Sequence, residues 1–126
     1  MKDLRLNLPI MNDKILSLCG LAKRAGKVTV GTNMVTSFIR GKVKPQLVIL
    51  SSDASDNSKK KISDSCEYHN VKLIFSDYTM IELGHAIGQS GGAACIAVAD
   101  AGFSKAILNH YETKETANSK DSQEVK

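Results

Sequence analysis

The segment Gly31-Thr32-Asn33 has the residue types best suited to binding, because it stands between an expected strand and an expected helix. The first amides of a helix have no partner inside that helix, so they can donate to a phosphate group or to the polar edge of a base. Asn33 adds an amide donor and an amide acceptor, and Gly31 lets another backbone come close. The same residues are also ordinary at the start of a helix, so the segment alone leaves its function open.

A block of positive charge flanks this segment in the sequence. The formal net charge is +4, and the charges of residues 113–126 balance to zero. Between Asp13 and Asp53 there is no acidic residue, and the basic residues there are Lys14, Lys23, Arg24, Lys27, Arg40, Lys42 and Lys44. Clustered positive charge attracts polyanions, although it is also typical of a solvated face. We expect the cations closest in sequence, Lys27 and Arg40, to surround the turn.

Lys59, Lys60 and Lys61 stand at the start of a later expected helix. Lysines in a first turn oppose the helix dipole, which could indicate an anionic partner. A solvated basic face is the interpretation that we favour.

Residues that could perform catalysis or hold a metal do not form a recognisable set. His69, His85 and His110 have no nucleophile in a recognisable frame, and the glycine-rich phosphate-binding motifs of nucleotide enzymes are absent. Asp53 and Asp56 are typical of turn and capping residues. We therefore expect no catalytic residue, no metal site and no cofactor.

The cysteines Cys19, Cys66 and Cys95 form no CxxC pair and have no histidine at metal-ligand spacing. Each lies among apolar neighbours, so we expect them to pack in the core as small hydrophobic residues. No apolar run approaches the roughly 18 residues that would cross a bilayer. The first residues also lack the apolar block of a signal peptide, and we expect a cytosolic protein without a membrane partner.

Apolar residues at helical spacing predict five helices. The first is capped by Asn12 or Asp13, carries Ile15, Leu18, Cys19, Ala22 and Ala25 inward, and ends at Gly26. The second is capped by Thr32, buries Val35, Phe38 and Ile39, and ends at Gly41. The third is capped by Ser55, Asp56 or Asn57 and buries Ile62 and Cys66. The fourth is capped by Ser76 or Asp77 and carries Met80, Leu83 and Ile87, and the last is marked by Phe103 and Ile107.

Four strands alternate with these helices, at residues 28–30, 47–50, 71–75 and 95–99. The run 47–50 is apolar throughout, which is typical of a strand covered on both faces. The alternation predicts an α/β fold, with a sheet of about four strands, at least partly parallel, and helices on both faces. We expect an N-terminal extension at residues 1–12, one domain at 13–112, and a disordered tail at 113–126.

With these residues assembled, the chain resembles the kink-turn-binding ribosomal protein family of the archaeal L-seven-Ae type, and more closely a small bacterial member. The matching segments are GLAKRAGKVTVGTN (20–33), IRGKVKPQLVILSSDAS (39–55), ELGHAIG (82–88) and DAGFSKAI (100–107). They span most of the body in order. The resemblance implies a three-layer α/β/α sandwich with a mixed sheet, and a strand-to-helix loop that reads the sheared G·A pairs of a kink-turn.

The resemblance also implies the residues that contact RNA. The first loop gives Gly31, Thr32 and Asn33, and a second loop, from Ile87 to Ala93, closes over an extruded nucleotide. The full set of expected RNA-binding residues is Lys23, Arg24, Lys27, Gly31, Thr32, Asn33, Met34, Ser37, Arg40, Ile87, Gly88, Gln89 and Ser90.

Two departures from the family pattern bear on specificity. Kink-turn binders of this family carry an acidic residue after the Asn and a lysine one turn later, where this chain has Met34 and Ser37. Methionine cannot accept from a guanine edge as a carboxylate can. The second loop is also polar and glycine-rich rather than apolar. These departures favour RNA binding in general over kink-turn specificity.

The sequence therefore predicts a non-catalytic, monomeric RNA-binding protein that acts on structured RNA, of ribosomal origin, or on the ribosome. A protein-interaction adaptor with reduced RNA binding on the same fold remains the alternative. An enzyme that uses the loop at residues 88–92 is the third and least favoured interpretation.

Overall fold

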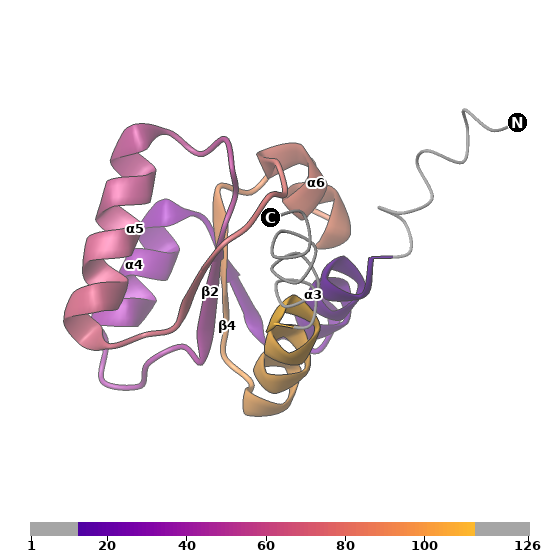
Figure 1. Ribbon diagram of the computed structural model, residues 1–126, viewed down its shortest axis with the longest axis horizontal. Coiled ribbons are helices and arrows are strands. Elements are labelled where there is room, and N and C mark those ends of the chain that lie inside the picture. Colours follow the sequence, from indigo (N-terminus) through magenta and orange to yellow (C-terminus); the bar gives the residue numbers. More distant parts are fainter. Residues whose placement is uncertain (1–12, 113–126) are drawn as a thin grey trace, which may run out of the picture.

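The computed structural model describes residues 13–112, in which a four-stranded sheet lies between two layers of helices (Figure 1). The strands are β1 (Val28–Val30), β2 (Leu47–Leu50), β3 (Leu73–Phe75) and β4 (Cys95–Val98). The helices are α3 (Lys14–Arg24), α4 (Thr32–Arg40), α5 (Asp56–His69), α6 (Met80–Ala86) and a helix at residues 101–112. The predicted α/β/α sandwich is confirmed. The predicted extension at 1–12 and tail at 113–126 lie outside the described residues.

Three of the four strands run in the same direction. The order in the sheet is β1-β4-β2-β3, in which β2 and β3 are parallel and β4 is antiparallel to both β1 and β2. Val30, Leu50 and Phe75 therefore end their strands at one edge of the sheet, where β4 begins. We call this the carboxyl edge, and it lies at the top of Figure 1. Because α4, α5 and α6 follow these strands, each begins near this edge.

Alternating residues of the central strands fill two separate cores. Leu47 and Ile49 of β2 pack with α3, α6 and the helix at 101–112, whereas Val48 and Leu50 pack with α4 and α5. Side chains alternate between the two faces of a strand, so a strand that is apolar at every position must be covered on both sides. All four residues of β2 are indeed buried, as predicted.

Side-chain caps define where α3 and α5 begin. The Asp13 carboxylate accepts from the amides of Ile15 and Leu16 at 2.8 and 3.2 Å, so the prediction of a cap at 12 or 13 holds for Asp13, and Asn12 lies outside the described residues. The Ser55 hydroxyl accepts from the amide of Ser58 at 3.1 Å, which confirms the first of the three predicted caps of α5.

The cap of α6 differs from our prediction. Thr79 and Glu82 form a reciprocal capping box, and neither Ser76 nor Asp77 is the cap. Ser76 is unavailable because its hydroxyl donates to the carbonyl of Leu50 at 2.7 Å and accepts from the amide of Tyr78 at 3.3 Å. A tertiary contact therefore overrides a local capping signal.

Smaller differences occur at the ends of other elements. Ala25, expected inward, is the exposed C-cap of α3. β3 begins at Leu73 rather than at 71, because the amide of Val71 donates to the carbonyl of Cys66 and so belongs to the end of α5. β4 ends at Val98, one residue before the predicted end.

Candidate nucleic-acid interface

The turn from Gly31 into α4 has no side-chain cap, unlike the starts of α3, α5 and α6. The N-cap is Gly31, with φ 97° and ψ 150°, so the prediction of Thr32 as N-cap is wrong. The Gly31 amide donates to the carbonyl of Cys95 at 3.0 Å, which fixes the turn against the start of β4. Because glycine offers no side-chain acceptor, the first-turn amides of α4 remain for an acceptor from outside the helix.

Asn33, Met34 and Ser37 lie on the exposed side of the first turns of α4. Residues three and four positions apart share one face of a helix, so these three side chains form a continuous patch beside the turn. Met34 is 62% exposed, so it adds an apolar side chain to the surface of this patch. The predicted first loop and the two positions that depart from the family pattern are thus brought together.

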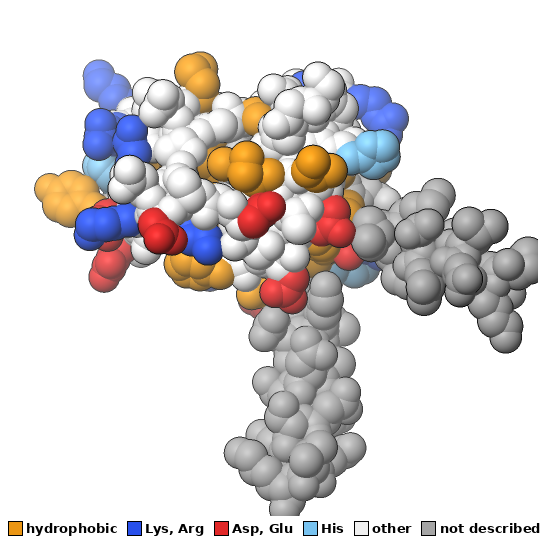
Figure 2. Space-filling model, turned by 90° about the horizontal axis from the view of Figure 1, so that it is seen from above, with side chains coloured by type: hydrophobic (Ala, Val, Ile, Leu, Met, Phe, Trp, Pro, Cys, Tyr) orange, Lys and Arg blue, Asp and Glu red, His pale blue; other side chains and the backbone are white. Residues whose placement is uncertain are grey.

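Residues of α5 complete this patch. The Thr32 hydroxyl donates to the Ser58 hydroxyl at 3.0 Å, and the Lys61 ammonium donates to Oδ1 of Asn33 at 3.1 Å. Lys60, the residue before Lys61, forms an ion pair with Asp64 at 3.3 Å, and both side chains are well exposed. Figure 2 shows the edge from above, with Lys and Arg side chains gathered on the left, where α4 and α5 lie.

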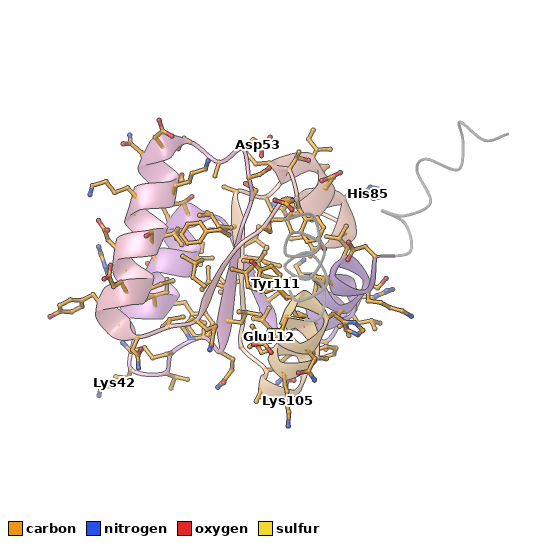
Figure 3. The ribbon with its side chains drawn as sticks, viewed as in Figure 1. Lys42, Asp53, His85, Lys105, Tyr111 and Glu112 are labelled. Atoms are coloured by element: carbon orange, nitrogen blue, oxygen red, sulfur yellow. The ribbon has the colours of Figure 1, made fainter. Side chains whose placement is uncertain are left out.

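The structure does not bring the four predicted cations beside the turn. Lys27 precedes β1, and Val28 pairs with Val98 at the opposite end of the sheet from Gly31. Arg40 is the last residue of α4, about 12 Å of helix rise from Thr32. The same opposite edge holds Lys42 in Figure 3, while Asp53 lies at the carboxyl edge.

Lys23 and Arg24 lie on the other face of the molecule. They end α3, which covers the face of the sheet opposite α4 and α5 (Figure 1). Arg24 lines a groove of about 670 Å³ between α3 and α6, together with residues such as Ile81 and His85. The cation in contact with Asn33 is Lys61, which we had assigned to a solvated face. The one signal in the sequence that could have identified Lys61 is the set of lysines at the start of α5, where positive charge opposes the helix dipole.

The second predicted loop lies beside the first. It leads directly into Cys95, whose carbonyl accepts from Gly31, so both loops meet at the carboxyl edge. Gly88, Gln89 and Ser90 are exposed there. The side chain of Ile87, which the resemblance also implied for RNA contact, is only 4% exposed and packs in the core.

The cysteines are core residues, as predicted. Cys19 and Cys95 are fully buried and Cys66 nearly so. Burial raises the pKa of the Cys19 thiol to about 12, with a further contribution from the nearby Asp13 charge, and burial raises the pKa of Cys66 and Cys95 to about 11. Such thiols stay protonated at neutral pH and are poor nucleophiles.

Within residues 13–112, the potential metal ligands are His, Cys, Asp and Glu side chains. No cluster of three or more His, Cys, Asp or Glu side chains suits a metal ion in that part of the chain. His69 contacts Lys44 at 3.2 Å, and His85 is exposed on α6 (Figure 3). Within the same residues, no helix is both long and apolar enough to span a membrane.

Comparison with protein families gives one match that covers most of the chain. Residues 13–108 match the family described as ribosomal protein L7Ae/L30e/S12e/Gadd45. Two curated relatives are called RNA-binding protein YlxQ. The one from Bacillus subtilis is 38% identical over 73% of this chain and 89% of its own length, and the one from Enterococcus faecium is 35% identical over 73% and 85%.

Solved structures give the same arrangement of elements. A protein of unknown function from Bacillus halodurans is 37% identical, with a TM-score of 0.69 over 79% of this chain and 97% of the other. A 15.5 kD RNA-binding protein from Giardia lamblia has a TM-score of 0.65 over 83% and 91%, at 18% identity, which is a likeness of fold alone.

Proposed function

Because the chain belongs to the ribosomal protein L7Ae/L30e/S12e/Gadd45 family, we propose that it is a non-catalytic RNA-binding protein whose carboxyl edge contacts structured RNA. The observation that carries this proposal is the start of α4, where the N-cap is Gly31 and no side chain caps the first amides. These amides lie beside the exposed Asn33, which contacts Lys61. These groups donate hydrogen bonds and add positive charge, which suits phosphate and base acceptors. The relatives called RNA-binding proteins support the same assignment.

The RNA that this edge fits is folded rather than a regular duplex. The major groove of an RNA helix is too deep and narrow for side chains, so proteins read RNA through its shape, unpaired bases and 2′-hydroxyls. Two adjoining loops, at Gly31 and at residues 88–90, can follow such an irregular surface. Ribosomal RNA is the class that the family suggests. Action in the cytosol and as a monomer remains a prediction.

Kink-turn recognition is the finer part of the proposal, and Met34 and Ser37 bear directly on it. Both lie exposed beside Asn33, at the place where an acidic residue and a lysine would extend the contact. Losing one charged hydrogen bond costs roughly 1 to 3 kcal/mol. We therefore expect the chain to bind a kink-turn hairpin and to prefer it over a matched duplex only modestly.

Binding to defined RNAs tests this function. Fluorescence polarisation would compare a hairpin carrying tandem sheared G·A pairs, the same hairpin with Watson–Crick pairs in their place, and a plain duplex. We expect affinity for the folded hairpin to fall steeply between 50 and 200 mM salt, on the order of tenfold or more, because neutralised phosphates release counterions. Weak affinity for every RNA, unchanged by salt, would refute the proposal.

A substitution at Asn33 tests the location of the interface. Asn33→Ala should lower affinity for the hairpin about five- to tenfold, because the side-chain hydrogen bonds are lost. Gln46→Ala is the matched control, since Gln46 carries the same amide group, is exposed, and precedes β2 at the opposite edge. Equal RNA affinities of the two variants would indicate that the interface lies away from the Gly31 turn.

A protein-interaction adaptor is the second candidate, and the exposed apolar side chain of Met34 favours it. The substitution Met34→Lys separates the two functions because its effects have opposite signs. Added positive charge strengthens contact with RNA, whereas a lysine in an apolar protein contact weakens it. Loss of retention on ribosomes in this variant, together with no effect of Asn33→Ala, would favour the adaptor.

A further inference from the structure

The contact between Lys61 and Asn33 fixes which half of the Asn33 amide is free. An ammonium group has only donors, so it can meet the amide oxygen but not the amide nitrogen. The distance of 3.1 Å from Nζ to Oδ1 is a hydrogen bond in that sense. The NH₂ group of Asn33 is thereby left to face away from Lys61.

Two packed helices hold this contact in place. Residues 33 and 61 are far apart in sequence, but α4 and α5 both start at the carboxyl edge and share one core, in which Val35, Ile39 and Ile62 are fully buried. The hydrogen bond from Thr32, one residue before Asn33, to Ser58, one helical turn before Lys61, joins the same ends of the two helices. The fold therefore places Lys61 within hydrogen-bond reach of the Asn33 side chain.

The remaining groups around Asn33 are also mostly donors. The uncapped start of α4 offers amides, Lys61 adds a positive charge, and Met34 supplies only a weak thioether acceptor. No side-chain carboxylate in residues 13–112 forms a hydrogen bond or ion pair with Lys61, whereas Lys60 is paired with Asp64. A carboxylate at position 34 would have read a donor edge of a base. This chain presents the opposite chemistry.

We propose that Lys61 is a positioning residue that turns the Asn33 amide outward as a donor, so that the site selects hydrogen-bond acceptors on RNA. This inference rests on the proposed RNA-binding function. The acceptor is a purine N7, a base carbonyl oxygen or a phosphate oxygen. All three present a lone pair to the same donor, and the experiments below separate base from phosphate.

The free protein tests the positioning directly. Lys61→Met removes the donors and keeps an unbranched chain, and Lys60→Met is the matched control on the same helix. In NMR spectra we expect the side-chain amide resonances of Asn33 to move in Lys61→Met, to stay in place in Lys60→Met, and to return in Lys61→Arg. Asn33 resonances unchanged by Lys61→Met would overturn the proposal whether or not RNA binds.

Affinity for the hairpin with sheared G·A pairs tests the consequence. We expect Lys61→Met to weaken binding about three- to tenfold beyond Lys60→Met, with recovery to within about twofold in Lys61→Arg. Adding Lys61→Met to Asn33→Ala should cost little more, because the two residues act as one unit. Fully additive losses, with a salt dependence reduced by one phosphate contact, would mean that Lys61 acts only as a charge and would overturn the positioning role.

A modified RNA identifies the acceptor. Replacing guanine N7 by C–H, or the guanine carbonyl oxygen by hydrogen, in the sheared pairs should weaken RNA binding by the wild-type protein but not by Lys61→Met, if the acceptor is on the base. Replacing nearby phosphates by uncharged methylphosphonates should weaken binding by the wild-type protein but not by Lys61→Met, if the acceptor is a phosphate oxygen. Either result supports the proposal, and a wild-type affinity that responds to neither change refutes it. If no RNA binds at all, the proposed function fails instead, while the NMR test still decides the positioning.

Discussion

Gly31 joins β1 to α4 through a backbone conformation that is almost restricted to glycine. Its φ of 97° with ψ of 150° lies in the region where a Cβ atom clashes with its own backbone. No neighbouring atom lies within 4 Å of the place where that Cβ would stand, so the cost of any side chain there is conformational. The residue that follows β1 is thus also the one that leaves α4 without a side-chain cap.

Gly31→Ala should destabilise the protein by about 1 to 3 kcal/mol, the usual cost of such backbone strain. It should also weaken RNA binding, since relief of the strain moves the first amides of α4. Urea unfolding followed by circular dichroism measures the first effect. Gly41→Ala is the control at the other end of α4, where φ is −73° and the nearest contact would be 3.4 Å. The two variants unfolding at the same urea concentration would contradict the argument.

At the scale of elements, hydrophobic spacing predicted the helices and strands because burial decides them. The run 47–50 and the helix positions Val35, Ile39 and Ile62 are buried as expected. Helix caps were less predictable. Thr32 and Ser76 are both suited to cap a helix, but their hydroxyls form hydrogen bonds with Ser58 and with the carbonyl of Leu50 instead. Local sequence cannot rank a capping bond against a tertiary one.

The proposed binding site was predictable only in part, for a related reason. Gly31 and Asn33 form one turn, so their spacing in sequence is their spacing in space. Lys27 and Arg40 are close in sequence but are separated from that turn by the length of β1 and of α4. Lys61 comes from the next helix, and only the parallel packing of α4 and α5 brings it to Asn33. Charge proximity along a chain is therefore a poor guide to charge proximity across elements.

The loop that precedes β4 depends on a close approach to α6. A Cβ on Gly84 would lie 2.5 Å from the Cα of Gly92 and 2.8 Å from the carbonyl oxygen of Gln89, both backbone atoms. The amide of Gln89 also donates to the carbonyl of Gly84 at 2.7 Å. The loop can therefore fold against the helix only while position 84 lacks a side chain.

Gly84→Ala should displace the loop at residues 88–92, destabilise the fold by about 1 to 3 kcal/mol, and weaken RNA binding if that loop contacts RNA. Gly91→Ala is the matched control in the same loop, because a Cβ there would meet nothing within 4 Å. Thermal unfolding and the hairpin binding assay measure the two effects. A Gly84→Ala variant that unfolds like Gly91→Ala would show that the loop has room to adjust.

At the scale of the whole molecule, the topology places the proposed binding edge apart from the two hydrophobic cores. Three strands end at the carboxyl edge and deliver the starts of α4, α5 and α6 there, whereas the two cores lie on the faces of the sheet. Side chains at the edge are exposed and free to vary, as Met34 and Ser37 do relative to the family pattern. The faces hold all three thiols, Cys19 on one side and Cys66 and Cys95 on the other.

Because of these buried thiols, the free energy of unfolding depends on pH in the alkaline range. The pKa of a thiol is 9.0 without burial, but it is about 11 for Cys66 and Cys95 and about 12 for Cys19 in the folded protein. Burial also raises the pKa of Tyr78, which in addition donates to the Asp13 carboxylate at 2.8 Å. Above pH 9 the unfolded chain therefore releases protons that the folded chain retains, and the free energy of unfolding must fall as pH rises.

We expect the free energy of unfolding to change little from these groups below about pH 8 and to decrease between pH 9 and about 11, by up to about 1.4 kcal/mol per pH unit for each thiol. Above about pH 11 the loss levels off for Cys66 and Cys95 as they ionise in the folded protein, whereas the loss from Cys19 continues to about pH 12. Urea unfolding at a series of pH values, with reducing agent present, measures the profile. Cys19→Ala should lower stability at every pH because it leaves a cavity, yet its slope above pH 9 should be shallower by one proton. An unchanged slope in that variant would mean that Cys19 is not protected from ionisation by the core.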